Sequence, residues 1–177
     1  MACRALLALG SNLGPRERNL DAAWAHLAAA GVRVLAATPR WNTAPIGAPP
    51  QPDYLNQLLL ADGRPDPWGW LAAAQAAEGE RSRLIDKGPR RLDVDVILVE
   101  GEESSDPRLQ LPHPALLERP YLLLGAALLV PRWKAGRGGR EILEIAGKAL
   151  PPDWCLDLQD QPPPLARQAG QRSGPAR

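Results

Sequence analysis

Residues 91–99 (RLDVDVILV) constrain the fold more than any other segment of the chain. Polar and apolar residues alternate at its start, and the last four residues are all apolar. Alternation indicates a strand with one buried face, whereas an unbroken apolar run indicates a strand that is covered on both faces. The segment therefore predicts a central strand of a sheet, with one polar face near the strand's start.

The rest of the pattern predicts an α+β sandwich, in which helices pack on a mostly antiparallel sheet. Further strands are expected where short apolar runs end at glycine, proline or polar residues: 4–9, 32–38 and 54–61. Helices are expected where apolar residues recur at helical spacing: 15–29, 67–80, 116–130 and 140–148. Asp66 is expected to cap the second of these helices, with Pro67 at its first position. Proline cannot continue a helix, so Pro120 is expected to begin a new helix within the stretch 116–130. A short polar turn is expected after Gly101.

Two polar stretches are predicted to be loops, and the C-terminus is predicted to be a tail. Residues 42–53 (NTAPIGAPPQPD) contain four prolines and a glycine, which favour a long surface loop of the kind that is often functional. Residues 81–90 form the second loop. The composition predicts a single domain over residues 1–158 and a disordered, proline-rich tail over 159–177.

Charge and cysteine content narrow the class of protein. The net charge of +1 argues against a general binder of nucleic acids or membrane surfaces, which is normally strongly basic. The longest apolar run, 121–130, is far shorter than the ~20 residues that cross a bilayer. Cys3 and Cys155 lie at opposite ends of the chain and suggest reduced thiols. A cytoplasmic protein is expected.

Asp93 and Asp95 are the first candidate site residues. Side chains alternate along a strand, so both carboxylates point to the same face, while Val94 and Val96 point into the core. Two adjacent carboxylates repel each other unless a cation or arginines neutralise them. Such oxygen ligands suit Mg²⁺, which completes its shell with water and phosphate oxygens. The spacing alone equally allows two solvated aspartates on an exposed strand face.

Arginines cluster close to the two aspartates. Arg81, Arg83, Arg90 and Arg91 surround the second predicted loop. Arginine binds phosphate oxygens through a planar fork, so cations beside a carboxylate pair fit a site that holds a metal and a polyphosphate together. Salt bridges on a polar surface remain the alternative, above all for Arg91.

Residues 86–97 (DKGPRRLDVDVI) resemble the signature of the 6-hydroxymethyl-7,8-dihydropterin pyrophosphokinase family, over twelve positions. Other segments resemble the same family in the same order: 9–13, 41–47, 51–56, Gln75 with Glu78, 112–114 and 119–121. The resemblance covers roughly residues 4 to 133.

The resemblance implies a ferredoxin-like α+β fold and one reaction of folate biosynthesis. The hydroxymethyl oxygen of the pterin attacks the β-phosphorus of ATP, a pyrophosphoryl group moves, and AMP leaves. By this resemblance Asp93 and Asp95 bind two Mg²⁺ ions, and Asp95 assists deprotonation of the hydroxyl. Arg81 and Arg83 are the further catalytic candidates and reach the phosphates from their loop.

The resemblance also implies the binding residues and a monomeric state. Tyr54 and Tyr121 are the only tyrosines in a chain without phenylalanine, and both fall where the family sandwiches the pterin ring. The pterin-binding candidates are Thr43, Pro45, Ile46, Tyr54, Asn56 and Tyr121. The ATP-binding candidates are Gln75, Glu78, Arg90, Ile97, His113 and Arg119.

Three other functions remain open at this point. A Mg²⁺-dependent nucleotidyltransferase could use the same two aspartates and release pyrophosphate in place of AMP. A catalytically retired protein could bind pterin or ATP without turnover, although the intact aspartate pair speaks against it. A nucleic-acid binder could use the arginines, but the low net charge disfavours it.

Overall fold

The computed structural model describes residues 3–45, 50–79, 88–136 and 138–150. The strands are β1 (Cys3–Ser11), β2 (Arg33–Ala37), β3 (Trp41–Thr43), β4 (Tyr54–Arg64), β5 (Asp93–Val99), β6 (Ser104–Asp106) and β7 (Leu109–Leu111). The helices are α1 (Arg16–Ala29), α2 (Pro67–Glu78), α3 (Ala115–Glu118), α4 (Pro120–Leu129) and α5 (Ile142–Ala149).

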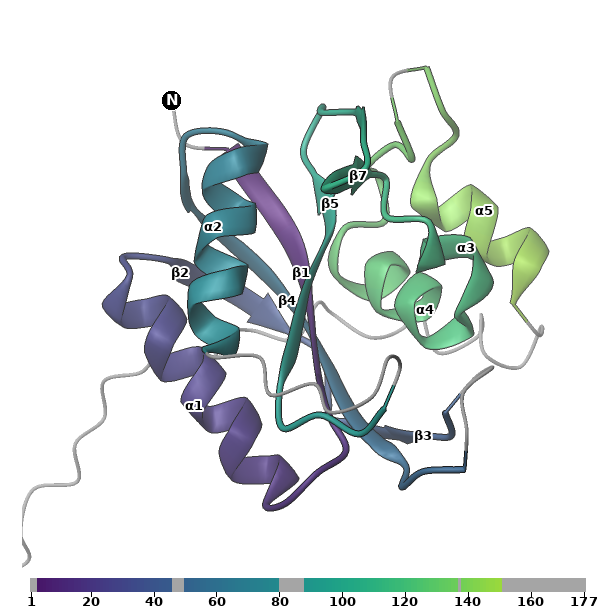
Figure 1. Ribbon diagram of the computed structural model, residues 1–177. Coiled ribbons are helices and arrows are strands. Elements are labelled where there is room, and N and C mark those ends of the chain that lie inside the picture. Colours follow the sequence, from purple (N-terminus) through teal and green to yellow (C-terminus); the bar gives the residue numbers. More distant parts are fainter. Residues whose placement is uncertain (1–2, 46–49, 80–87, 137, 151–177) are drawn as a thin grey trace, which may run out of the picture.

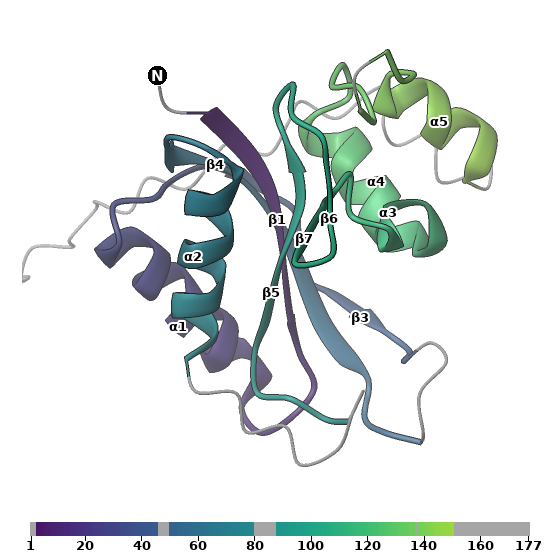
Figure 2. The same cartoon turned by 45° about the horizontal axis from the view of Figure 1, so that its top comes forward.

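One antiparallel sheet lies at the centre of the fold. Its strand order is β2-β4-β1-β5, and the short β3 also pairs with β4. Helices α1 and α2 cover one face of this sheet, and α3, α4 and α5 lie on the other side (Figures 1 and 2). The strands β6 and β7 form a separate two-stranded sheet. The expected α+β architecture is confirmed. The prediction that residues 91–99 form a central strand is wrong, because β5 stands at the end of this strand order and is an edge strand. Its apolar run arises because residues on both of its faces are buried.

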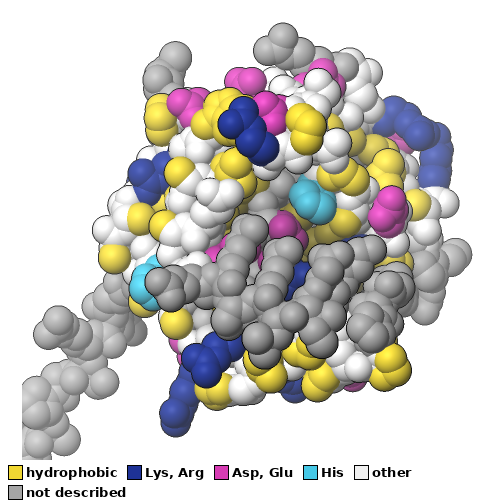
Figure 3. All heavy atoms as spheres, in the orientation of Figure 1, with side chains coloured by type: hydrophobic (Ala, Val, Ile, Leu, Met, Phe, Trp, Pro, Cys, Tyr) yellow, Lys and Arg dark blue, Asp and Glu magenta, His cyan; other side chains and the backbone are white. Residues whose placement is uncertain are grey.

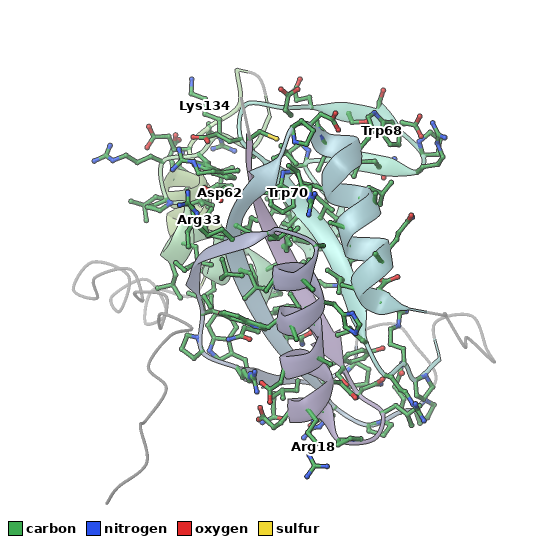
Figure 4. The ribbon with its side chains drawn as sticks, turned by 90° about the vertical axis from the view of Figure 1, so that its left-hand side faces the viewer. Arg18, Arg33, Asp62, Trp68, Trp70 and Lys134 are labelled. Carbon is green, nitrogen blue, oxygen red and sulfur yellow. The ribbon has the colours of Figure 1, made fainter. Side chains whose placement is uncertain are left out.

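Each face of the sheet has its own hydrophobic core. Ala5, Leu7 and Leu9 of β1 pack beneath α1 and α2, together with the fully buried Trp70 of α2 (Figure 4). The alternate β1 residues contribute to the second core, beneath α4 and α5. Because both faces of β1 are covered, nearly every residue of this strand is buried.

Local sequence signals set the ends of α2. The Asp66 side chain accepts the Gly69 N–H at 2.7 Å, and Pro67 occupies the first turn, as the sequence predicts. The helix ends at Gly79, whose φ of +68° favours glycine. The last helical residue is therefore Glu78, which lies beside the start of β5 because its side chain accepts the Val94 N–H at 3.0 Å.

Three short strands were not predicted. The stretch 42–53 was predicted to be loop throughout, but β3 includes residues 42 and 43 and pairs with β4. The hairpin of β6 and β7 lies in a stretch predicted to be a polar turn and an unassigned segment. Strands of three residues are too short for alternation to identify, and they form here because a partner strand lies alongside.

Two predictions on chain organisation fall partly outside the described residues. The predicted tail, 159–177, and most of the second predicted loop lie there. No helix of the described ranges is both long and apolar enough to cross a membrane.

Candidate active site

The strand register brings residues from β4, β1 and β5 into one row. Gly10 at the end of β1 pairs with Asn56 of β4 on one side and with Asp93 of β5 on the other. Directly paired residues share a face, so Asn56 and Asp93 flank Gly10 on the same side of the sheet. A Cβ at position 10 would lie only 2.8 Å from the Asn56 Oδ1 atom. Glycine at this position therefore leaves room for the Asn56 amide.

Asp93, Asp95 and Ile97 lie on one face of β5, because they are two residues apart. Ile97 is fully buried in the core beneath α4, whereas the two aspartates keep partly exposed side chains. On this face of β5 the hydrophobic core beneath α4 therefore reaches Ile97, and the two aspartates lie just beyond it. Acidic, basic and histidine side chains gather near the middle of this face of the molecule (Figure 3).

The two carboxylates have different environments. Asp93 forms an ion pair with Arg90, with Nη1 and Oδ1 2.6 Å apart. Burial, followed by the negative charges of Asp93 and Glu78, raises the pKa of Asp95 to about 7, against the opposing effect of Arg119 and Arg90. The negative charges around Asp95 thus make its charged form unfavourable.

Arg90 has one donor that the described part of the chain leaves unused. Its Nε atom is buried and has no hydrogen-bond partner there, while its Nη1 atom contacts Asp93. A buried donor without a partner is costly, so this atom is suited to an anionic ligand such as a phosphate oxygen.

A second set of side chains approaches from α3 and α4. Arg119 precedes α4, Tyr121 lies in its first turn, and the guanidinium of Arg119 contacts the Tyr121 hydroxyl. Burial raises the pKa of Tyr121, Arg119 lowers it, and the nearby Asp95 and Asp93 raise it again. The tyrosine therefore lies close to the carboxylate pair.

His113 is held by two backbone contacts. Its N–H donates to the Ile97 carbonyl at 2.9 Å, and its Nδ1 atom accepts the Ala115 N–H at 3.1 Å. Burial lowers the pKa of His113, and so does the positive charge of Arg119. A neutral imidazole that accepts at Nδ1 carries its proton on Nε2, so the free nitrogen is a donor.

The expected pterin side is built by β3 and β4. Thr43 pairs with Tyr54, and the Asn56 Nδ2 atom donates to the Thr43 Oγ1 atom at 2.6 Å. The Tyr54 hydroxyl donates to the Gln51 Oε1 atom at 3.4 Å. Pro45 follows β3 and is half-buried. The unpredicted strand β3 is therefore what places Thr43 beside Asn56.

The remaining predicted residues are placed less centrally or not described. Glu78 lies near Asp95, and Gln75 is exposed one turn earlier on α2. The Ile97 side chain has no exposed surface and its carbonyl accepts from His113, so its contact with ATP remains a prediction without support from this arrangement. The predictions for Arg81, Arg83 and Ile46 concern residues outside the described ranges.

Sequence reasoning assigned no role to two residues of the site. Gly10 was only part of a resembling segment, although a glycine within an apolar strand signals a close approach of another group. Asn12 is 2% exposed and contacts three separate parts of the backbone and side chains around the site. A lone asparagine after a strand carries no signal that would have revealed these contacts.

The residues present fit magnesium bound together with a phosphate ligand. The donor set is two carboxylates on one strand face, and burial together with repulsion by Asp93 disfavours the charged form of Asp95 and raises its pKa. A divalent cation removes this repulsion. Within the described ranges no group of three or more His, Cys, Asp and Glu side chains forms a closed cage. An ion held by Asp93 and Asp95 would take its other ligands from water and phosphate oxygens, as is typical of Mg²⁺.

Comparison with known proteins decides the family. The sequence model of the 7,8-dihydro-6-hydroxymethylpterin-pyrophosphokinase (HPPK) family matches residues 6–131. The chain belongs to the HPPK family. This match confirms the resemblance on which the expected fold and reaction rest.

Similar HPPK proteins are named as pyrophosphokinases. The 2-amino-4-hydroxy-6-hydroxymethyldihydropteridine pyrophosphokinase of Methylorubrum extorquens is 36% identical over 84% of this chain and 94% of its own length. The protein of the same name from Pseudomonas aeruginosa is 38% identical over 81% and 91%. Other HPPK relatives are longer: the folate synthesis bifunctional protein of Chlamydia trachomatis is 33% identical, and this chain spans 30% of it.

A solved HPPK structure shares the fold. The Plasmodium falciparum HPPK-DHPS, crystallised with pterin and p-hydroxybenzoate, superposes with a TM-score of 0.60 at 12% identity. The superposition covers 84% of this chain and 43% of that chain. It confirms the expected HPPK fold.

Proposed function

We propose that the Asp93–Asp95 face carries out the reaction of the HPPK family. That reaction transfers a pyrophosphoryl group from ATP to the hydroxymethyl group of 6-hydroxymethyl-7,8-dihydropterin in folate synthesis. The hydroxymethyl oxygen attacks the β-phosphorus of ATP, the bond from that phosphorus to the α-phosphate oxygen breaks, and AMP leaves. The reaction depends on positioning and charge neutralisation, which a rigid sheet edge with fixed charges can provide.

The family generally uses Mg²⁺, and we assign its binding to Asp93 and Asp95, with two ions bound together with ATP. The ions supply neutralising charge for the triphosphate and polarise the reacting oxygens. In this proposal Asp95 accepts the proton of the attacking hydroxyl.

The triphosphate lies between the two sets of basic side chains. Arg90 offers its unused Nε donor, and Arg119 lies on the opposite flank with His113. The imidazole donates from Nε2 because Nδ1 is occupied by Ala115. Glu78 and Gln75 contact the nucleotide from α2, and the proposal extends to Arg81 and Arg83 as phosphate ligands.

The pterin occupies the side formed by β3 and β4. Tyr54 and Tyr121 supply aromatic faces for the ring, and Asn56 supplies both a donor and an acceptor for its edge. Thr43 orients the Asn56 amide through their 2.6 Å contact, which leaves the Oδ1 atom as the acceptor. Pro45 and Ile46 complete this side in the proposal.

One observation carries this function. Asp93 and Asp95 lie close to two arginines, Arg90 and Arg119. Asp93 also lies in one row of the sheet with Asn56, whose side chain is on the same face. A nucleotidyltransferase could use the carboxylates and the arginines, but it has no need for the Asn56 amide beside them.

The deciding experiment identifies the nucleotide product. The chain is incubated with ATP, Mg²⁺ and 6-hydroxymethyl-7,8-dihydropterin, and nucleotides are separated by chromatography. We expect AMP that depends on the pterin and is absent when EDTA is added. Release of pyrophosphate in place of AMP would support nucleotidyl transfer, and saturable pterin binding without product would indicate a retired enzyme. Light scattering of the same sample tests the expected monomer.

A further inference from the structure

Asn12 joins three segments that meet at the site. Its Nδ2 atom donates to the Gln51 Oε1 atom at 2.8 Å and to the Pro52 carbonyl at 3.2 Å. Its Oδ1 atom accepts the Arg90 N–H at 2.9 Å, and its own N–H donates to the Arg90 carbonyl at 3.2 Å. The side chain is almost completely buried.

Two of the partners of Asn12, Arg90 and Gln51, belong to different sides of the site. Arg90 forms the ion pair with Asp93, on the phosphate side. Gln51 accepts from the Tyr54 hydroxyl, on the pterin side. Asn12 bonds to both of these residues, and its carboxamide uses its acceptor for Arg90 and its donors for the segment of Gln51.

This arrangement continues the sheet beyond the end of β1. In an antiparallel pair, two residues exchange backbone N–H and carbonyl bonds. Asn12 and Arg90 make the same exchange, but the Asn12 side-chain oxygen takes the place of the backbone carbonyl. A shift of Arg90 therefore moves the carboxamide directly, and the carboxamide is bonded to the segment that precedes β4.

We propose that Asn12 is a positioning residue that couples the nucleotide side of the site to the pterin side. Occupation of the phosphate side fixes Arg90, which fixes the Asn12 carboxamide and, through it, Gln51 and Tyr54. Each substrate then binds more tightly when the other is present, and the enhancement is equal in both directions. This inference rests on the proposed function, because it uses its two substrate sides.

The test measures coupling between the substrates in the intact chain. Affinity for 6-hydroxymethyl-7,8-dihydropterin is measured by calorimetry with Mg²⁺, with and without an ATP analogue that has a methylene group between the α- and β-phosphorus atoms. The ratio of the two dissociation constants is the coupling factor. In the unaltered chain we expect the analogue to tighten pterin binding roughly fivefold or more.

Two variants divide the contacts of Asn12. Asn12→Asp has nearly the same shape and keeps an acceptor for the Arg90 N–H, but it loses both donors to Gln51 and Pro52. We expect its analogue affinity to stay within about twofold of the unaltered chain, while the coupling factor falls toward one. Asn12→Ala loses the acceptor for Arg90 as well as the donors to Gln51 and Pro52. It should lose the coupling and some of the affinity for the ATP analogue. If the alanine variant does not fold, the aspartate variant still decides the question.

Asn19→Ala is the matched control. Asn19 donates to the Ser11 Oγ atom at 3.0 Å and to the Leu13 carbonyl at 2.9 Å, so it braces the turn around Asn12 without contacting either side of the site. We expect this variant to keep the coupling factor. Equal loss in Asn19→Ala and Asn12→Asp would mean that general loosening of the turn is responsible, and the inference would be wrong.

The remaining outcomes are also decisive. Unchanged coupling in a folded Asn12→Asp variant overturns the inference, as does the absence of coupling in the unaltered chain. Both results leave the proposed function intact if the unaltered chain still forms AMP. Absence of pterin-dependent AMP from the unaltered chain refutes the proposed function itself.

Discussion

The two faces of β1 differ in how far the hydrophobic core extends along them. Along β1, Ala5, Leu7 and Leu9 point to α1 and α2 and are buried in a continuous apolar core. On the opposite face the order is Leu6, Ala8 and then Gly10, and the apolar surface ends at Gly10. The first face is buried along its whole length and is called the closed face. The second, called the open face, is buried at one end and carries the candidate site at the other.

This contrast shows how one strand serves both purposes. Side chains alternate with a period of two, so the closed face can hold the strand in place without regard to what the other face carries. The charged residues Asp93 and Asp95 are tolerated because Val94 and Val96 anchor the same strand from behind. The molecule can thus keep an electrostatically costly pair on a rigid support.

The largest effect is expected from Asp95→Ala on the open face. Under the proposed function this carboxylate binds the ions and accepts a proton, so its removal should lower kcat by roughly 10³-fold or more. The rate of AMP formation measures it. Asp62→Ala serves as the control, because Asp62 pairs with Arg33 on a different part of the surface (Figure 4) and should leave the rate unchanged. A rate within tenfold of the unaltered chain would contradict the assigned role.

Leu7→Ala should lower the stability of the fold and leave substrate binding nearly unchanged, because Leu7 is fully buried on the closed face. A cavity in a well-packed core costs about 2–5 kcal/mol in the free energy of unfolding. Urea denaturation measures this loss. The KM values for both substrates should change little in the fraction that remains folded, and a large selective rise in either KM would show that the two faces are not independent.

The stability of Asp95→Asn, measured without metal at several pH values, tests the cost of the charged pair on the open face. The pKa of Asp95 rises from 3.8 to about 7 on folding, so the folded chain retains a proton that the unfolded chain releases. Its contribution to stability therefore falls as the pH rises from about 4 to 7, and the full penalty remains above 7. Asparagine removes this penalty.

We expect Asp95→Asn to be more stable than the unaltered chain by roughly 1–3 kcal/mol at pH 8, and by much less near pH 4. Urea denaturation in EDTA at both pH values measures the difference. A stabilisation that is equal at both pH values would show that charge is not its cause.

The smallest effect is expected from Gly10→Ala at the boundary of the open face. The added methyl group would meet the Asn56 Oδ1 atom, so the amide must shift. We expect the KM for the pterin to rise about tenfold and the KM for ATP to change less, since a misplaced hydrogen bond costs about 1.4 kcal/mol. Steady-state kinetics measure both.

Gly147→Ala is the matched glycine control for that comparison. No atom lies within 4 Å of a Cβ at this position in α5, so the substitution should leave both KM values unchanged. A similar rise in both glycine variants would contradict the close approach at Gly10 as the cause.

Much of the fold and part of the site were predictable, for identifiable reasons. Alternation in residues 91–99 placed Asp93 and Asp95 on one face, and the turn chemistry of Asp66 and Pro67 marked the start of α2. These features depend on neighbours in the chain, which a sequence shows directly. The strand β3 was missed because its three residues are too few to show alternation, and it is recognised through its pairing with β4.

The sequence by itself determined the helices, the longer strands and the family, because periodicity, capping and an ordered set of motifs are properties of residues close together in the chain. Only the tertiary structure decided how Asn12 joins residues near 51 and 90, and why position 10 has to be glycine. These contacts depend on the register of strands that lie far apart in the sequence. A register is set by the packing of the whole sheet.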